Sequence, residues 1–306
     1  MIKKLMAVFI SAAFVLAGCS GNSQKEESKE EVKAFEGKYV VNADYVKNNL
    51  ENKDVIFVDA RGADALKTGT LKKAVLLSWP EIANVANKKP GEEGWGHILS
   101  AEELSKKLSE VGLDKNKEIV LFSNGNAGWG EDGRILWELK AAGYTNLKMV
   151  DGGIDAIKAS GVELSKEVDK TNPVEVKIES IDYKNTINTE QLTKDKDKYK
   201  IIDTREKDEY DGATKYNEAK GGHIPGAINI PYSSLYNENG LLKSNEEIEK
   251  IFKDAGIEKT DSIVTYCTGG IRSAFMQLMM EMSGYENVKN YEGSYYNWVA
   301  VNPVEK

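Results

Sequence analysis

The feature that most constrains this chain is an internal repeat. The segment SAEELSKKLSEVGLDKNKEIVLFS, which starts at Ser100, aligns without a gap on SNEEIEKIFKDAGIEKTDSIVTYC, which starts at Ser244, at an offset of 144 residues (244 − 100). Apolar positions of one segment match apolar positions of the other. The same offset relates VIFVDAR, ending at Arg61, to YKIIDTR, ending at Arg205. The chain therefore contains two successive copies of one domain.

The length of the chain suits two domains. Once an N-terminal leader and tether are set aside, about 270 residues remain, which is comfortable for two domains. A charged, proline-containing stretch at residues 165–180 is the predicted linker. We therefore expect an N-terminal copy at residues 38–164 and a C-terminal copy at residues 181–306.

Each copy contains the pattern of a helix that leads into a buried strand. A serine followed three residues later by a glutamate has the form of a capping box, which satisfies free amide groups where a helix begins. Apolar residues then recur at helical spacing, and an apolar run of strand length follows. The two capping boxes are Ser100 with Glu103 and Ser244 with Glu247. Such alternation predicts an α/β fold in which each copy is a mainly parallel sheet flanked by helices.

The first 18 residues predict an export signal. A basic start precedes an apolar stretch that is shorter than the roughly 20 residues needed to span a bilayer. Residues 16–19, LAGC, resemble the lipobox of bacterial lipoproteins, which implies that Cys19 is lipidated; an ordinary cleaved signal is the alternative. Residues 19–37 are polar and predict a flexible tether. We expect a lipid anchor on the extracytoplasmic face of the cell membrane.

The composition argues against several classes of function. A formal net charge of −8 disfavours a nucleic-acid partner. The chain has only two cysteines and two histidines, so dedicated zinc or iron–sulfur sites, which need clusters of these ligands, are not expected. We expect no metal and no cofactor, although carboxylate-bound ions stay open.

The second cysteine lies in a context typical of a reactive thiol. If Cys19 is lipidated, Cys267 has no partner for a disulfide. It follows the apolar run IVTY and precedes the loop TGGIR and a helix-forming run. A strand, a tight loop and a helix N-terminus direct backbone N–H groups at one point, and Gly269 and Gly270 let the backbone curl around the sulfur. With the charge of Arg272, this predicts a thiolate with a lowered pKa. A small buried cysteine and an anion site without covalent chemistry are the alternatives.

Several ordered motifs resemble the rhodanese family of sulfurtransferases. The segment CTGGIRSA, residues 267–274, is similar to the active-site loop of that family. GGHIPGAINIP, residues 221–231, resembles its internal glycine–histidine motif, and Asp203-Thr-Arg205 resembles its strand end. YENVKNYEGSYYNW, residues 285–298, is similar to its last strand and glycine turn. The resemblance covers both copies and implies two tandem rhodanese-like domains.

The resemblance implies an enzyme with one working copy. Tandem members of the family are thiosulfate or 3-mercaptopyruvate sulfurtransferases in which only the second domain carries the cysteine. Here Ser123 stands at the position equivalent to Cys267. The implied mechanism is covalent: the Cys267 thiolate takes the outer sulfur of a donor such as thiosulfate and passes it from a persulfide to a thiophilic acceptor such as cyanide or a thiol.

The loop residues are the expected binding groups. Their backbone amides would stabilise the persulfide anion, much as an oxyanion hole stabilises its charge. Arg272 would hold an anionic donor or the departing sulfite; a surface arginine at a helix start is the alternative. The expected binding residues are Thr268, Gly269, Gly270, Ile271 and Arg272.

Three further residues of the motifs are expected to support the site. Asp203 and Arg205 have counterparts in the N-terminal copy, Asp59 and Arg61, which favours a buried structural ion pair over catalysis. His223 invites a Cys–His hydrolase interpretation, but the family motif explains it structurally.

The N-terminal copy is expected to pack against the C-terminal copy and wall the pocket, since crevices between domains commonly serve as sites. Trp95, Trp129 and Arg134 are candidates for that wall, with core packing favoured for each tryptophan. Where some vertebrate-type tandem enzymes carry a second substrate-binding arginine, this chain has Glu209. Thiosulfate, 3-mercaptopyruvate and polysulfide therefore stay open as donors.

Two other classes of function are weighed. Related folds serve as phosphatases and arsenate reductases, whose loops place five residues between cysteine and arginine. Here there are four residues between Cys267 and Arg272, which favours sulfur transfer. The non-enzymatic alternative is a carrier of sulfane sulfur, or a redox sensor, at the membrane.

Overall fold

The computed structural model describes residues 33–306, which form one compact unit. The predicted signal at residues 1–18, Cys19 and most of the predicted tether lie outside the described residues. Among the described residues, no helix is long and apolar enough to cross a membrane.

The N-terminal copy contains a five-stranded sheet in the order β1-β5-β4-β2-β3. All of its strand pairs are parallel. Its strands are β1 (Val40–Val41), β2 (Val55–Asp59), β3 (Val75–Leu76), β4 (Glu118–Phe122) and β5 (Leu147–Val150). Its helices are α1 (Ala43–Asn49), α2 (Ala65–Thr68), α3 (Ala101–Glu110), α4 (Glu131–Ala141) and α5 (Gly153–Ala159), with 3₁₀ turns η1 (Gly62–Asp64), η2 (Trp79–Glu81) and η3 (Gly125–Ala127).

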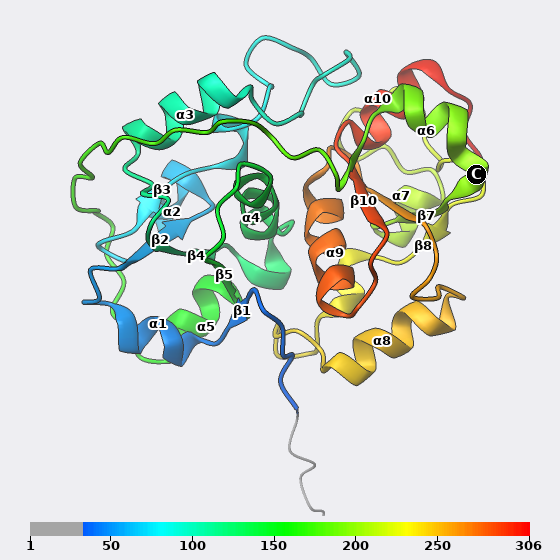
Figure 1. The fold of residues 1–306 in the computed structure, drawn as a ribbon. Coiled ribbons are helices and arrows are strands. Elements are labelled where there is room, and N and C mark those ends of the chain that lie inside the picture. The colour runs from blue at the N-terminus through cyan, green and yellow to red at the C-terminus, as the bar shows by residue number, and fades with distance from the viewer. Residues whose placement is uncertain (1–32) are drawn as a thin grey trace, which may run out of the picture. The chain divides into compact units, whose positions relative to one another are not determined.

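The C-terminal copy repeats this topology in the order β6-β10-β9-β7-β8, again with parallel pairs only. Its strands are β6 (Thr186–Ile187), β7 (Lys200–Asp203), β8 (Ile228–Asn229), β9 (Ile263–Tyr266) and β10 (Val288–Tyr291). Its helices are α6 (Thr189–Asp195), α7 (Lys207–Tyr210), α8 (Asn245–Asp254), α9 (Ile271–Met282) and α10 (Ser294–Val301), with 3₁₀ turns η4 (Lys196–Lys198) and η5 (Tyr232–Leu235). The predicted α/β fold with two mainly parallel sheets is confirmed (Figure 1).

The predicted capping boxes start α3 and α8. In α8 the amide of Glu247 donates to Oγ of Ser244 at 3.3 Å, and the amide of Ser244 donates back to the Glu247 carboxylate at 2.9 Å. The same reciprocal pair caps α3. Both helices are amphipathic: α8 buries Ile248 and Phe252 and leaves its charged face in solvent.

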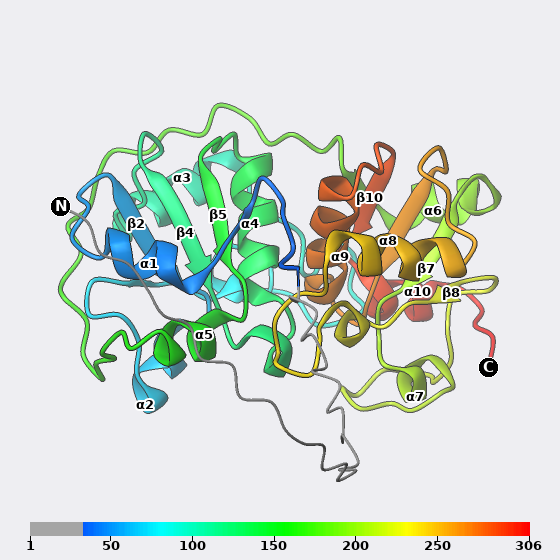
Figure 2. The ribbon, with the colours of Figure 1, turned by 90° about the horizontal axis from the view of Figure 1, so that it is seen from below.

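Helix α9 is of another kind, because almost all of it is buried. Its sequence, IRSAFMQLMMEM, has too few charges to face solvent, and residues 271–280 are all buried. It packs against α4 of the N-terminal copy, so the two helices lie side by side between the sheets (Figure 2). One hydrophobic core runs through this contact from one copy to the other, and it includes Ile135 on α4 and Phe275 on α9.

The predicted linker, residues 165–180, follows the surface of the N-terminal copy along α3 (Figure 1). It contains no helix or strand. The amide of Val176 donates to Oγ of Ser109 at 3.0 Å, and the amide of Ile178 donates to Oγ of Ser105 at 2.9 Å. Both linker side chains are buried. The connection between the copies is therefore fastened to the protein rather than free.

Candidate active site

Cys267 directly follows β9, a strand in the middle of its sheet, and lies at the carboxyl edge where parallel sheets bind ligands. The next three residues form a tight loop, and α9 begins at Ile271. Gly270 has a positive φ of 87°, and a Cβ there would lie 2.4 Å from the carbonyl oxygen of Glu292. Only glycine fits this position without strain. A Cβ on Gly269 would lie 3.1 Å from the ring of Trp95.

The sulfur of Cys267 accepts a hydrogen bond from the amide of Gly270 at 3.1 Å. The hydroxyl of Ser273 lies 3.7 Å from the sulfur, a contact that the sequence pattern did not predict, and its proton is shared with Oδ1 of Asn290 at 2.7 Å. Burial on its own raises the pKa of Cys267, but the charge of Arg272 and the N–H and hydroxyl of Ser273 outweigh it, so the net pKa is lowered. The site favours a thiolate, which is the nucleophilic form.

Arg272 is not a surface side chain, because it is only 5% exposed. Its guanidinium forms a two-pronged ion pair with Glu209, with Nη1 to Oε2 at 2.7 Å and Nη2 to Oε1 at 2.9 Å. Nη2 also donates to the hydroxyl of Thr268 at 2.9 Å. Burial opposes ionisation of Glu209, but Arg272 lowers its pKa overall and keeps it charged. The positive charge beside the thiol is therefore largely compensated.

Asp203 and Arg205 form a fully buried ion pair after β7. Arg205 donates through Nε and Nη2 to the Asp203 carboxylate at 3.0 and 2.6 Å, and Nη2 reaches the carbonyl of Gly222 at 2.7 Å. In the N-terminal copy, Arg61 pairs with Asp59 in the same manner, with Nε to Oδ1 at 2.9 Å and Nη2 to Oδ2 at 2.6 Å. This geometry agrees with the structural role expected for both pairs.

The ring of His223 is buried away from the sulfur. It stacks on Tyr210, with ring centroids 3.6 Å apart. Nδ1 lies 3.0 Å from the carbonyl of Tyr210, and Nε2 lies 3.7 Å from the carboxylate of Glu305. Both ring nitrogens thus face other groups, and the described residues contain no Cys–His pair.

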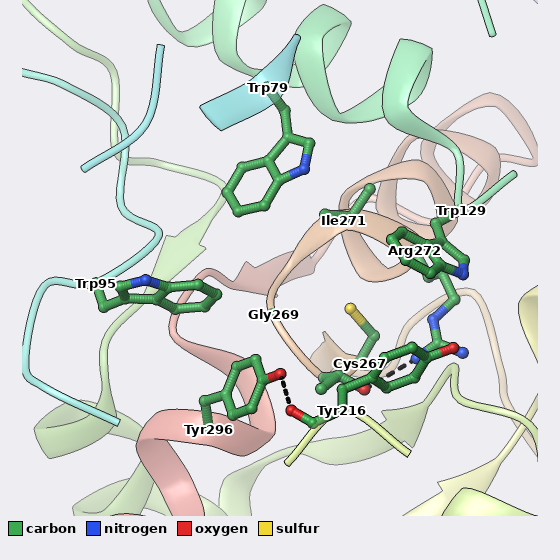
Figure 3. A pocket seen from close by; sticks show the side chains of 10 residues that line it. Trp79, Trp95, Trp129, Tyr216, Cys267, Gly269, Ile271, Arg272 and Tyr296 are labelled. Atoms are coloured by element: carbon green, nitrogen blue, oxygen red, sulfur yellow. Dashed lines mark hydrogen bonds between the residues drawn. The ribbon is translucent and has the colours of Figure 1, made fainter. Parts of the chain in front are cut away.

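A cavity of about 270 Å³ opens above Cys267 (Figure 3). It lies between the copies, as the sequence analysis expected. Five aromatic side chains line it together with Cys267, Thr268, Gly269, Ile271 and Arg272. They are Trp79, Trp95 and Trp129 from the N-terminal copy and Tyr216 and Tyr296 from the C-terminal copy.

Core packing is therefore an incomplete account of Trp95 and the wrong one for Trp129. Trp129 is 46% exposed at the cavity. Trp95 is buried, but it lines the cavity and lies edge-on to Tyr296 with ring centroids 5.1 Å apart. Both tryptophans are flanked by glycines, in GWG, and this loop-like setting is the signal that points away from a core. Trp79, Tyr216 and Tyr296 carry no comparable signal and were missed.

Arg134, the third candidate for the wall, lies behind the loop instead of lining the cavity. It is fully buried and its Nε donates to Glu138 at 2.7 Å. Nη1 donates to the carbonyl of Gly270 at 3.0 Å, and Nη2 donates to the carbonyl of Gly96 at 2.6 Å. An arginine of the N-terminal copy thus holds the catalytic loop of the C-terminal copy.

At the equivalent place in the N-terminal copy, Ser123 is buried after β4, and the cavity beside Gly125 and Phe275 holds only about 10 Å³. A wider cavity of about 550 Å³ touches the same loop at Asn126, but Ser123 does not line it. The space beside Gly125 is filled from the other copy. The hydroxyl of Tyr232 donates to the carbonyl of Gly125 at 3.1 Å. The ring of Phe275 packs so closely on α4 that a Cβ at Gly133 would lie 2.5 Å from it.

In the described part of the chain, no three Asp, Glu, His or Cys side chains cluster as metal ligands. The groups assembled around the cavity are a thiolate, hydrogen-bond donors to sulfur, one compensated arginine and aromatic rings. They suit covalent chemistry on sulfur.

Comparison with known proteins supports this chemistry. The model of the rhodanese-like domain matches residues 42–160 and 188–301. A protein of Mycobacterium bovis named "Putative thiosulfate sulfurtransferase 1" is 30% identical over 282 residues, which cover 87% of this chain and 97% of the relative. The sulfur carrier protein TtuD of Thermus thermophilus is 28% identical over 85% of this chain and 93% of its own.

Solved structures share the fold. SseA of Escherichia coli, described as a 3-mercaptopyruvate sulfotransferase, has a TM-score of 0.73 at 21% identity and covers 84% of this chain and 98% of its own. EanB, solved as a cysteine persulfide with ergothioneine, has a TM-score of 0.76 at 21% identity, over 88% of this chain and 70% of its own. With both domain matches and the thiol site in place, the chain belongs to the rhodanese family and is a sulfurtransferase with two tandem rhodanese-like domains.

Proposed function

We propose that Cys267 carries the transferred sulfur as a persulfide, between a sulfane-sulfur donor such as thiosulfate and a thiophilic acceptor such as cyanide or a thiol. The proposal rests on one observation. The buried thiol of Cys267 has a lowered pKa, accepts a hydrogen bond from the amide of Gly270 at 3.1 Å and lines an open cavity.

The first half-reaction begins with attack of the Cys267 thiolate on the outer sulfur of the donor. With thiosulfate, the bond between the two donor sulfurs breaks and its electron pair leaves with sulfite, so the enzyme retains Cys267–S–S⁻. The amide of Gly270 and the hydroxyl of Ser273 already face the cysteine sulfur and would stabilise charge there. In the second half-reaction, the acceptor attacks the outer sulfur and the electron pair returns to Cys267.

Two observations disfavour the phosphatase interpretation. Four residues, one fewer than in the phosphatase loops, separate Cys267 from Arg272. The guanidinium of Arg272 is paired with Glu209 and is therefore not free to bind an oxyanion. Because Glu209 neutralises the charge of Arg272, little positive charge is left to bind the phosphate group of an ester beside the thiolate. Activity on an aryl phosphate is expected to be absent.

The names of relatives guide the choice of donor. Several relatives carry the name thiosulfate sulfurtransferase, which makes thiosulfate the first donor to test, with 3-mercaptopyruvate and polysulfide next. The relative named as a sulfur carrier makes stoichiometric carriage the second candidate. The carrier would load one sulfur without turning over, whereas the enzyme would cycle.

The test is intact mass spectrometry of residues 33–306 after exposure to each donor, with Cys267→Ala in parallel. A gain of about 32 Da, the mass of one sulfur, is expected only with Cys267 present, followed by discharge to cyanide as thiocyanate over many cycles. A single discharge without cycling would favour the carrier. No loading from any of the three donors would overturn the persulfide assignment.

We propose further that Cys19 is lipidated after removal of residues 1–18, which would place the enzyme at the outer face of the cell membrane. The support is the sequence alone, LAGC after a short apolar run. Detergent-phase partitioning of the full chain and of Cys19→Ala tests it. Membrane retention that survives the substitution would contradict the proposal.

A further inference from the structure

Aromatic rings surround the sulfur of Cys267 on several sides (Figure 3). Trp95 stands edge-on to Trp79 on one side, at 6.1 Å between ring centroids, and edge-on to Tyr296 on another, at 5.1 Å. Across the cavity, Trp129 stands edge-on to Tyr216 at 5.5 Å. Faces and edges of rings therefore form most of the surface that a reacting molecule meets.

Hydrogen bonds hold this lining in place. The hydroxyl of Tyr296 donates to the carbonyl of Tyr216 at 2.6 Å, and the amide of Tyr296 donates to the carbonyl of Thr268 at 3.1 Å. The edge of Trp95 lies against Gly269 of the catalytic loop. Tyr296 is thus bonded to Tyr216 and to the loop that carries Cys267, and Trp95 contacts the same loop.

Apart from the charge that stabilises the Cys267 sulfur, the cavity lining offers little positive charge to a further anionic group. Arg272 is the one cationic side chain among the described residues that line it, and Glu209 compensates that charge at 2.7 and 2.9 Å. Glu218 is a further buried carboxylate nearby; it accepts the amide of Tyr216 at 2.8 Å. Burial, and then the negative charges of Glu218 and Cys267, raise the pKa of Tyr296 to about 12.

We propose that the sulfur acceptor of this enzyme is a small organic thiol that carries no negative charge other than that of its reacting sulfur, and that its carbon body packs against these five rings. The proposal rests on the persulfide mechanism above and specifies its second half-reaction. Aromatic surface stabilises apolar and cationic groups. An anionic acceptor would lose its hydration in the cavity without gaining an uncompensated cation.

The chemical step is an exchange between sulfurs. The acceptor thiol loses its proton to solvent, and its thiolate attacks the outer sulfur of Cys267–S–S⁻. The bond between the two enzyme-bound sulfurs breaks, and its electron pair returns to Cys267 as the thiolate. The product is the persulfide of the acceptor, and no external oxidant or reductant is needed.

The test separates loading from transfer. The protein is first loaded with inorganic tetrasulfide, freed of excess reagent and checked by mass. It is then mixed with 3-mercaptopropanol, 3-mercaptopropionate, phenylmethanethiol or 2-(trimethylammonio)ethanethiol, and the loss of the persulfide is timed. Each rate is divided by the rate of the same thiol with glutathione persulfide in solution, which removes intrinsic differences in nucleophilicity.

The neutral, aromatic and cationic thiols are expected to react at least tenfold faster, roughly, than 3-mercaptopropionate after this correction. Equal rates, or a faster anion, would overturn the proposal about the acceptor while leaving the persulfide mechanism intact. Failure to load any sulfur would instead count against the mechanism itself.

Two variants sharpen the test. Trp129→Ala is expected to lower the rate at which phenylmethanethiol removes the persulfide by about fivefold or more, because part of the aromatic wall is lost. Tyr183→Ala is the matched control, since Tyr183 is an exposed aromatic residue that does not line the cavity. Glu209→Gln leaves Arg272 uncompensated and is expected to narrow the gap between 3-mercaptopropionate and 3-mercaptopropanol. An unchanged gap would show that charge compensation does not select the acceptor.

Discussion

The loops that follow β4 and β9 occupy the same place in two copies of one fold, yet Cys267 lines a cavity of about 270 Å³, whereas Ser123 is buried and the space beside Gly125 and Phe275 is about 10 Å³. Cys267 is followed by α9 four residues later, whereas Ser123 is followed by α4 eight residues later. Next to Cys267, a guanidinium and hydrogen-bond donors favour the anion. In the N-terminal copy, at the start of α4, burial and the charge of Glu131 raise the pKa of Asp132 to about 7 and favour the neutral acid.

The two copies also treat each other differently. Trp79 begins η2 and Tyr232 begins η5, at matching places after the short strands β3 and β8. Each extends toward the site of the other copy: Trp79 lines the cavity above Cys267, and Tyr232 reaches the loop after Ser123. The first leaves room for a substrate and the second fills the space. Topology therefore supplies the place for a site, while loop length and the side chains of the other copy determine whether that site is open.

Exchanging Ser123 and Cys267 is the most severe test of the difference between the open and the filled site. In the double variant Ser123→Cys, Cys267→Ser, both the loading of sulfur and turnover are expected to fall below detection, because the new thiol lies where Tyr232 and Phe275 fill the space. Intact mass spectrometry after exposure to thiosulfate measures the loading of sulfur. The release of thiocyanate in the presence of cyanide measures turnover. Cys267→Ser alone is the control and is expected to be equally inactive.

A persulfide on the thiol introduced at position 123 would break the comparison, since it would show that the filled site admits a donor. Melting curves of both variants establish that the fold survives the exchange.

Arg134 links the two copies and predicts an intermediate effect. Arg134→Lys keeps a positive charge beside Glu138, but it loses the two guanidinium hydrogen bonds to the carbonyls of Gly270 and Gly96. We expect the loading rate to fall about tenfold and the free energy of unfolding to drop by about 1–3 kcal/mol. The pKa of Cys267, followed by alkylation across pH, is expected to rise as Gly270 shifts.

Arg61→Lys serves as the matched control, because Arg61 also makes a buried ion pair and lies in the other copy, away from the loop. It is expected to lower stability without moving the pKa of Cys267. The same thiol pKa in both variants would reduce Arg134 to a purely structural residue.

Asp132 predicts the smallest effect on catalysis and a pH-dependent effect on stability. Its folded pKa of about 7 lies above the value of about 3.9 in an unfolded chain, so the folded state binds the extra proton between these values. Its contribution to stability is fully present below about pH 4 and is lost as the pH rises through about 7.

Asp132→Asn removes this titration. The variant is expected to match the parent near pH 4 and to be more stable by about 4 kcal/mol above about pH 7, since the folded and unfolded pKa values differ by about three, with loading of Cys267 unaffected. Denaturant unfolding at several pH values measures the difference. A difference that stays constant with pH would show that the carboxyl does not titrate as stated.

Much of the fold could be predicted because its signals are local. The capping boxes at Ser100 and Ser244, the helical spacing that follows them and the repeat at a constant offset depend on neighbouring residues only. They led to two parallel α/β copies and to Cys267 at a strand end, as observed. The glycines of the loop were likewise identified from their conformational freedom.

The rest could not be predicted from local signals because it depends on contacts between distant residues. Glu209 and Arg272 are 63 residues apart, and Arg134 and Gly270 are 136 apart. Trp79 carries no local signal of its role, and only its position in the folded protein makes it part of the cavity above Cys267.

The fold class, the reactive cysteine and the copy that carries it follow from the amino-acid sequence alone, because periodicity, capping and residue chemistry are local properties of the chain. The tertiary structure decided which charges reach the thiol, which rings surround it and why the other copy is closed. These follow from the way in which α4 and α9 bring the two copies together, and from side chains whose partners lie far away in the sequence.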